Sequence, residues 1–115
     1  MQYMLLIHSN EAAMRSMPQD AIARMHAAYM AYTEALTQAG AVVNGNRLRP
    51  VSSTTTVRVV DGKTQVLDGP YAETKEQLAG YYLIDVPDLD AALSWAARCP
   101  GASVGSIEVR PIWVM

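Results

Sequence analysis

Two helix-like segments, each set between strand-like segments, leave this 115-residue sequence few ways to fold. The longer helix is predicted from Pro18 to Ala39, where apolar residues recur at three- and four-residue spacing and Gly40 follows as a C′ glycine. The shorter helix is predicted from Leu89 to Cys99, after Asp88 as its N-cap. Their apolar stripes consist of Ile22, Met25, Tyr29, Tyr32 and Leu36 in the first helix, and of Leu89, Ala92, Leu93, Ala96 and Cys99 in the second.

Short runs rich in apolar, β-branched or aromatic residues predict the strands. They are Gln2 to His8, Ala41 to Leu48, Thr54 to Val60, Thr64 to Leu67, Ala79 to Val86 and Ile107 to Val114. Asp61-Gly62 between two of these runs is a strong hairpin signal. The order is therefore β-α-β, hairpin, β-α-β. This order indicates an α+β, ferredoxin-like split β-α-β sandwich, with helices on one face of an antiparallel sheet and an inserted β-hairpin.

The two central strands predict a partner molecule. Met4-Leu5-Leu6-Ile7 and Tyr81-Tyr82-Leu83-Ile84 are apolar throughout, which suggests burial of both strand faces. One layer of helices covers only one face of the sheet. A second copy of the chain would cover the other face, so we expect a homodimer.

The composition excludes several classes of protein. A formal charge of −2, without any basic run, argues against nucleic-acid binding. A single cysteine permits no internal disulfide, and no apolar run approaches the roughly 20 residues that span a membrane. The apolar start, Met1 to Ile7, lacks the basic leader and cleavage site of a signal peptide. We therefore expect one soluble, cytoplasmic domain over residues 1–115.

One segment resembles a known family signature. Asp68-Gly69-Pro70-Tyr71-Ala72-Glu73-Thr74-Lys75-Glu76 resembles the DGPF-AETKE signature of one branch of the YCII-related proteins, with Tyr71 where that branch usually has Phe. The resemblance covers nearly the whole chain. It extends to Tyr3-Met4-Leu5-Leu6-Ile7, Gly80-Tyr81-Tyr82 and Glu108-Val109-Arg110-Pro111. It implies a ferredoxin-like fold assembled as a dimeric α/β barrel, in a bacterial protein often encoded beside an extracytoplasmic-function sigma factor.

Residues 68–76, here called the signature loop, are the best candidate for a ligand site. The loop holds Asp68, Glu73, Lys75 and Glu76 next to the ring of Tyr71. A carboxylate near a lysine can hold a polar ligand or move a proton. The structural alternative is that Asp68 accepts backbone N–H groups and caps its own turn, while the other charges are solvated.

His26 is the candidate proton carrier, because it lies with Thr33 at the edge of the long helix's apolar stripe. The alternative is a surface histidine with a local partner. His8 ends the first strand, near the edge of the sheet. No metal-ligand spacing, phosphate loop or dinucleotide fingerprint is present, so no metal or cofactor is predicted. Cys99 lies on the buried helix stripe, which is typical of a small hydrophobe rather than a nucleophile.

Three functions stay open. The chain is a small-molecule enzyme or binding protein, an accessory protein for an extracytoplasmic-function sigma factor, or a structural dimer without chemistry. We favour the first, since superfamily relatives such as muconolactone isomerases and small-ring monooxygenases use the barrel interior as a pocket. It predicts a mostly enclosed, partly apolar cavity rimmed by the signature loop. The regulatory alternative predicts an exposed apolar patch outside the dimer contact.

Overall fold

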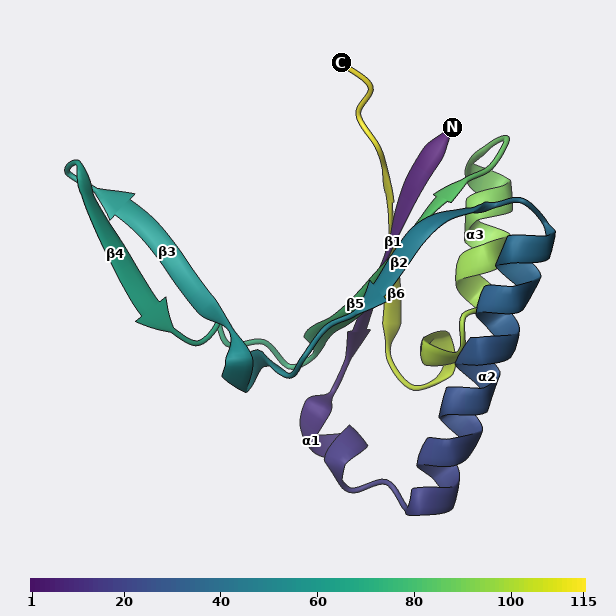
Figure 1. Ribbon diagram of the computed structural model, residues 1–115, viewed down its shortest axis with the longest axis horizontal. Coiled ribbons are helices and arrows are strands. Elements are labelled where there is room, and N and C mark those ends of the chain that lie inside the picture. The colour runs from purple at the N-terminus through teal and green to yellow at the C-terminus, as the bar shows by residue number, and fades with distance from the viewer.

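A computed structural model describes residues 1–115. A sheet carries two helices on one face, and a two-stranded arm projects from the opposite side (Figure 1). The elements run β1 (Gln2–Ser9), α1 (Glu11–Arg15), α2 (Gln19–Gln38), β2 (Val42–Arg47), η1 (Val51–Ser53), β3 (Thr55–Val60), β4 (Lys63–Asp68), β5 (Gln77–Asp85), α3 (Leu89–Arg98), η2 (Pro100–Ser103) and β6 (Ser106–Pro111). None of the helices has the length and apolar character needed to cross a membrane.

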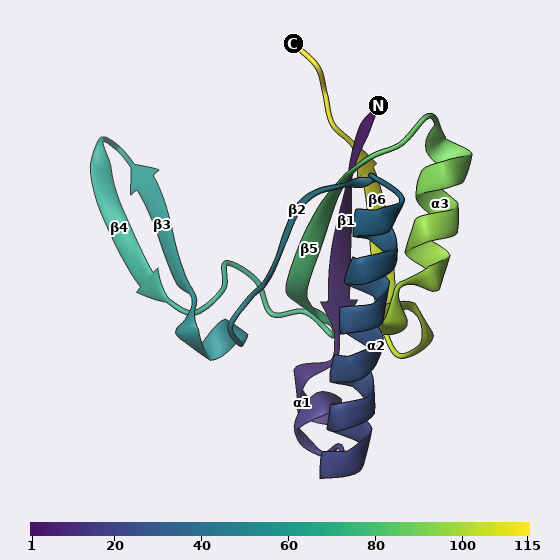
Figure 2. The same cartoon turned by 45° about the vertical axis from the view of Figure 1, so that its right-hand side comes forward.

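The four-stranded sheet is antiparallel, with the strand order β2-β5-β1-β6. Helix α2 leads from β1 to β2, yet β5 lies between those two strands. Helix α3 leads from β5 to β6, and β1 lies between that pair. Each helix therefore spans a strand contributed by the other half of the chain, and both helices pack on the same face (Figure 2).

The core lies between this sheet and the two helices. Leu5, Leu36 and Ile84 are fully buried there, and the Tyr32 hydroxyl donates to the Trp95 carbonyl at 2.6 Å, which joins α2 to α3. Along β1 the buried residues alternate with half-exposed ones. A single chain therefore buries one face of β1, because the helices cover only that face, and burial of the other face by a second copy stays a prediction.

The opposite face of the sheet has no helix over it. Its central side chains are Met4 and Leu6 of β1 and Tyr81 and Leu83 of β5, which are paired across the two strands. All four are partly exposed. We call these four residues the open face. The Tyr81 hydroxyl accepts a hydrogen bond from Asn46 at 2.9 Å, so a polar edge borders this apolar centre.

Several local signals in the sequence are confirmed. The Asp88 carboxylate caps α3 by accepting the Ala91 N–H at 2.9 Å. Asp61 and Gly62 have φ angles of 52° and 75°, as a type I′ hairpin turn requires. The ladder between β2 and β5 shifts its register between Val42 and Asn44, as a β-bulge does.

Other boundaries differ from the predictions. Ile22 is 43% exposed although it belongs to the predicted stripe, whereas the later stripe residues Tyr32 and Leu36 are buried. Leu89 and Leu93 of α3 are likewise exposed. Strand β6 ends at Pro111 and not at Val114, although the Ile112 N–H still donates to the Gln2 carbonyl of β1 at 2.9 Å.

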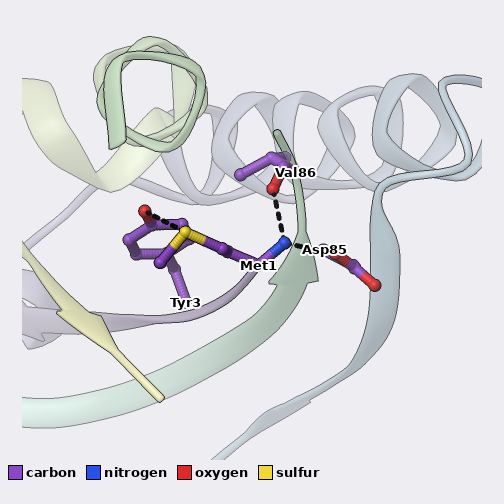
Figure 3. Close-up of polar contacts among 4 residues, drawn as sticks. All are labelled: Met1, Tyr3, Asp85 and Val86. Atoms are coloured by element: carbon purple, nitrogen blue, oxygen red, sulfur yellow. Dashed lines mark hydrogen bonds and ion pairs between the residues drawn. The ribbon is translucent and has the colours of Figure 1, made fainter. Parts of the chain in front are cut away.

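The start of β1 is fixed to the end of β5 by polar contacts. The Met1 ammonium donates to the Asp85 carboxylate at 3.1 Å and to the Val86 carbonyl at 2.9 Å (Figure 3). The Tyr3 hydroxyl reaches the Met1 sulfur at 3.8 Å. These contacts hold the two central strands in register at this end.

Candidate functional site

The signature loop begins with a backbone turn at the base of the arm. Asp68 ends β4 opposite Thr55, and Gly69 follows with a φ of 101°, a conformation that favours glycine. The Gly69 N–H donates to the Thr54 carbonyl at 2.7 Å, and the Gly69 carbonyl accepts the Thr56 hydroxyl at 2.8 Å. Backbone groups and Thr56 thus hold this turn.

The expected capping role of Asp68 is wrong. The Asp68 side chain is exposed and accepts no hydrogen bond, and the neighbouring Gly69 N–H and carbonyl already have Thr54 and Thr56 as partners. The carboxylate is therefore available to solvent or to a ligand.

The second half of the signature loop is fixed to two other elements. The Gln77 side chain donates to the Thr74 carbonyl at 2.7 Å and accepts the Glu11 N–H at 2.9 Å, which joins the loop to α1. The Glu76 carboxylate accepts the Ser106 hydroxyl at 2.8 Å, which joins it to β6. Lys75 stands between these two anchored points.

A pocket of about 510 Å³ lies between the signature loop, α1 and η1. Gly69 and Pro70 contribute its loop side together with Lys75. Its other polar side chains are those of Asn10, Glu11, Arg15, Ser52 and Gln77. Helix α1 brings Arg15 to the pocket, and it begins where the Asn10 side chain accepts the Ala13 N–H at 3.0 Å.

The charged side chains of this pocket differ in whether they already have a hydrogen-bond partner. Glu11 accepts the Val51 N–H at 3.0 Å, so its carboxylate already holds η1 in place. Arg15 and Lys75 form no ion pair and no side-chain hydrogen bond; the ion pairs of the chain involve Met1, His8 and Arg24. The pocket therefore offers two unpaired cations against one engaged carboxylate, which suits an anionic group.

Of the predicted ligand residues, Lys75 lines this pocket. Asp68, Tyr71, Glu73 and Glu76 are not among its lining residues, although Asp68 and Tyr71 flank Gly69 and Pro70 in the chain. The Tyr71 ring is 79% exposed. A ligand role for these four residues stays a prediction.

The two histidines lie in different surroundings. His26 is exposed on α2 and lines neither this pocket nor the larger groove of the molecule. Thr33, predicted to share its helix edge, bonds to the Tyr82 hydroxyl at 2.7 Å. A proton-carrier role for His26 stays a prediction.

His8 has the carboxylate partner that His26 lacks. Its Nε2 and the Glu108 Oε1 lie 3.0 Å apart. His8 also pairs with Ser106 across β1 and β6, and Ser106 donates to Glu76 of the signature loop. A polar row formed by His8, Glu108, Ser106 and Glu76 thus runs along the uncovered side of the sheet to the signature loop.

A larger groove of about 640 Å³ runs along α2 beside η2. Its cations are already engaged, since Arg24 pairs with Asp20 at 2.9 Å and the Arg98 guanidinium lies 4.2 Å from the centre of the Trp95 ring. Four alanines of α2 and Met25 make up much of its wall. The groove offers less chemistry to a ligand than the pocket at the signature loop.

The core contains weak acids that it keeps protonated. Burial raises the pKa of the Cys99 thiol and the pKa values of Tyr29, Tyr32 and Tyr82. The Cys99 thiol donates to the Tyr29 hydroxyl at 3.7 Å. A thiol with a raised pKa is a poor nucleophile, as the sequence predicted.

No three His, Cys, Asp or Glu side chains converge in the structure as a metal site would require. No motif singles out Arg15 or Glu11, because residues 11–17 predict only a loop or a short helical turn. The signal that could have identified them is that both follow β1 and the helix-capping residue Asn10, at a spacing of four residues.

Comparison with known proteins agrees with this architecture. An uncharacterised protein of Rhizobium meliloti is 39% identical over 114 residues, which cover 97% of this chain and 92% of that protein. The solved structure of 5-chloro-2-hydroxyhydroquinone dehydrochlorinase from Burkholderia phenoliruptrix, in complex with 2,5-dihydroxybenzoquinone, superposes with a TM-score of 0.54. It shares 14% identity over 98% of this chain and 94% of the enzyme, so the likeness concerns the fold. The YCII-related domain matches residues 1–115, and the chain belongs to the YCII-related family.

Proposed function

We propose that this chain binds a small organic acid, and transforms it or senses it, in the pocket between the signature loop and α1. The observation that carries the proposal is the convergence of Lys75 and Arg15, neither of them ion-paired, on one pocket of about 510 Å³. An Arg and a Lys that line the same pocket can bind carboxylate or phenolate oxygens through charge-assisted hydrogen bonds. Glu11 keeps its negative charge while it accepts the Val51 N–H, so Arg15, Lys75 and Glu11 together give the pocket a formal charge of +1.

The size of the pocket favours a ligand of one ring or a short chain. The structural neighbour is an enzyme solved with 2,5-dihydroxybenzoquinone, a small cyclic acid whose ring hydroxyls ionise readily. Its low identity supports only a shared fold, so the ligand class here rests on the charges of the pocket. We propose a cyclic carboxylic acid or an acidic ring hydroxyl.

If the bound molecule is transformed, we propose His8 with Glu108 as the acid–base pair. A carboxylate at 3.0 Å orients an imidazole for proton transfer. The hydrogen bond from Ser106 to Glu76 links this pair to the residue that follows Lys75. His26 is the second candidate, on the edge of α2 that carries Thr33.

We also propose the finer assignments implied by the signature loop. These are the DGPF branch of the family and a ferredoxin-like sandwich that pairs with a second copy as a dimeric α/β barrel. The antiparallel order β2-β5-β1-β6 with both helices on one face supports the ferredoxin-like sandwich. The uncovered open face supports pairing with a second copy of the chain. A link to a sigma factor rests on the resemblance alone.

Ligand titration followed by nuclear magnetic resonance tests the binding proposal. Benzoate and 2,5-dihydroxybenzoquinone should shift the amide signals of Gly69 and Lys75, whereas benzamide, the uncharged counterpart of benzoate, should not. Lys75→Met and Arg15→Met should each weaken benzoate binding about tenfold, as expected for one lost charge-assisted bond of about 1.5 kcal/mol.

Arg24→Met is the matched control, because Arg24 lies in the larger groove and is paired with Asp20. It should leave benzoate affinity unchanged. Equal binding of benzamide and benzoate, or a loss of affinity confined to Arg24→Met, would overturn the proposed site.

His8→Gln and His26→Gln separate the two candidate proton carriers. Calorimetric titration of benzoate in buffers with different ionisation enthalpies measures the protons taken up on binding. We expect proton uptake to disappear in His8→Gln and to persist in His26→Gln. The reverse result would assign the role to His26.

A further inference from the structure

The arm, β3 and β4 with their turn, has two chemically different faces. The register pairs Val57 with Val66 and Val59 with Thr64, and alternation along each strand places these side chains on one face. The other face carries Arg58, Lys63 and Gln65 together with Thr56, Val60 and Leu67. We call Val57, Val59 and Val66 the valine face. Both cations of the two strands, Arg58 and Lys63, lie on the other face, so the valine face is the less charged of the two and the better suited to burial.

Nothing in the single chain covers the valine face. Val57, Val59 and Val66 are 60%, 67% and 63% exposed, and the two strands form a sheet of their own. Figures 1 and 2 show the arm standing away from the rest of the molecule in both views. An isolated two-stranded hairpin is marginally stable in water, so an arm of this kind needs an apolar surface to pack on.

The dimensions of the chain show how much surface is left uncovered. The radius of gyration is 16.1 Å, whereas a compact chain of this length has about 13 Å. The accessible surface is 8135 Å², whereas a compact monomer of 12.5 kDa exposes about 6,200 Å². The chain thus exposes about 2,000 Å² more than a self-contained domain of its mass.

We propose that the arm is a clasp whose valine face packs on a second copy of this chain. The inference rests on the homodimer proposed above and names the element that holds it together. Two chains that each cover an excess of about 2,000 Å² bury about 4,000 Å² in total, which lies within the range of obligate homodimers. A small transient contact would leave most of this excess exposed.

A second copy is the occupant because the same chain carries two uncovered apolar surfaces, the valine face and the open face. A twofold axis repeats every contact, so an arm from each chain can cover apolar surface of the other in one closed assembly. The valine face and the open face are then both covered without any further partner.

The clasp also reaches the proposed ligand pocket. Val51, Ser52 and Gly69 line the pocket at the base of the arm, and the hydrogen bonds between Gly69, Thr54 and Thr56 join this base to β3. A partner that fixes the arm therefore also fixes one wall of the pocket.

Light scattering with matched variants tests the clasp. The wild type should run at micromolar concentration with twice the 12.5 kDa mass of one chain. Val66→Lys should raise the dimer dissociation constant at least tenfold. Leu67→Lys places the same charge one residue along β4, on the opposite face, and should leave the dimer intact. Far-UV circular dichroism checks that both variants keep the fold.

A dimeric Val66→Lys variant with wild-type affinity would overturn the clasp and leave the homodimer standing. A monomeric wild type would overturn both, and would be the result expected if another protein covers the arm.

Hydrogen exchange of the wild type gives a measurement that needs no variant. Amides of Thr55 to Asp68 should be protected above the dimer dissociation constant and lose protection below it. Rapid exchange of these amides in the dimer would contradict the clasp.

Discussion

The body of the molecule and its arm are both built from antiparallel strands, yet only the body buries their side chains. Along β1 every second residue is buried beneath α2 and α3. Along β3 and β4 every residue except Thr56 is exposed. Both regions carry the apolar and β-branched residues typical of strands, although the arm strands are the more polar. A strand pattern therefore predicts the strand and its two faces, whereas the surface that covers it depends on the assembly.

This difference separates two kinds of stability. The body closes its core with residues of the same chain, so its packing energy does not depend on protein concentration. The arm, if it is closed by a second copy, gains its packing energy only on association. Substitutions in the two regions should therefore respond differently to dilution.

The largest effect is expected in the body. Leu36 is fully buried between α2 and the sheet, so Leu36→Ala removes apolar contacts and leaves a cavity. The free energy of unfolding should fall by about 2–5 kcal/mol. Urea denaturation at several protein concentrations measures this loss, which should be the same at each concentration.

Val59→Ala in the arm is the matched comparison. Val59 is 67% exposed in the single chain, so its truncation should cost under about 0.5 kcal/mol once the protein is diluted to monomer. A large cost for Val59→Ala in the monomer would show that the arm packs on its own body.

The next largest effect is a loss of folding stability at alkaline pH, which should also arise from residues of the body. Burial raises the pKa values of Cys99, Tyr29, Tyr32 and Tyr82, whose ordinary values are about 8.5 for cysteine and about 10 for tyrosine. As the pH rises, the unfolded chain loses these protons first. The folded chain then binds more protons, so stability falls with rising pH.

These four groups should therefore leave the free energy of unfolding unchanged below about pH 8.5. Above that pH it should decline, by up to about 1.4 kcal/mol per pH unit for each group. Chemical denaturation between pH 7 and pH 10 measures the slope. Cys99→Ala should make the decline near pH 9 shallower, whereas Tyr71→Phe, which removes an exposed phenol, is the control. An unchanged slope in Cys99→Ala would show that the thiol does not contribute.

The arm and the body also meet at the pocket, which allows a smaller effect to be tested. If partner contacts steady the base of the arm, Val66→Lys should weaken benzoate binding about threefold, or about 0.6 kcal/mol. Leu67→Lys should not. Equal affinities in both variants would mean that the pocket forms without the clasp.

Much of the fold was predictable because its signals are local. Asp61-Gly62 specifies its turn through positive φ angles, and Asp88 specifies a helix start through one hydrogen bond. The exposure of Ile22 and of Leu89 was not predictable, because periodicity gives the apolar side of a helix and not how far the sheet extends beneath it.

The candidate site was predictable only in its loop. The signature loop places Lys75 from the sequence alone, but Arg15 reaches the same pocket from α1, which lies 60 residues earlier in the chain. His8 and Glu108 likewise meet across β1 and β6. Such long-range contacts depend on strand order and register, and no local spacing in the sequence encodes them.

The smallest effect is expected at Asp68, where sequence and structure disagree most directly. From its place before Gly69-Pro70, Asp68 should cap the turn, and Asp68→Ala should then cost about 1–2 kcal/mol. The structure leaves its carboxylate exposed and without a hydrogen bond. We therefore expect Asp68→Ala to change the free energy of unfolding by less than about 0.5 kcal/mol.

Thr56→Val is the matched variant, because the Thr56 hydroxyl donates to the Gly69 carbonyl that the turn presents. Removing that donor should cost about 1 kcal/mol, the usual net value of one hydrogen bond. Urea denaturation of the two variants side by side decides between the accounts. If Asp68→Ala proves the more costly of the two, the carboxylate caps the turn after all, and the base of the arm is held by a side chain rather than by its backbone.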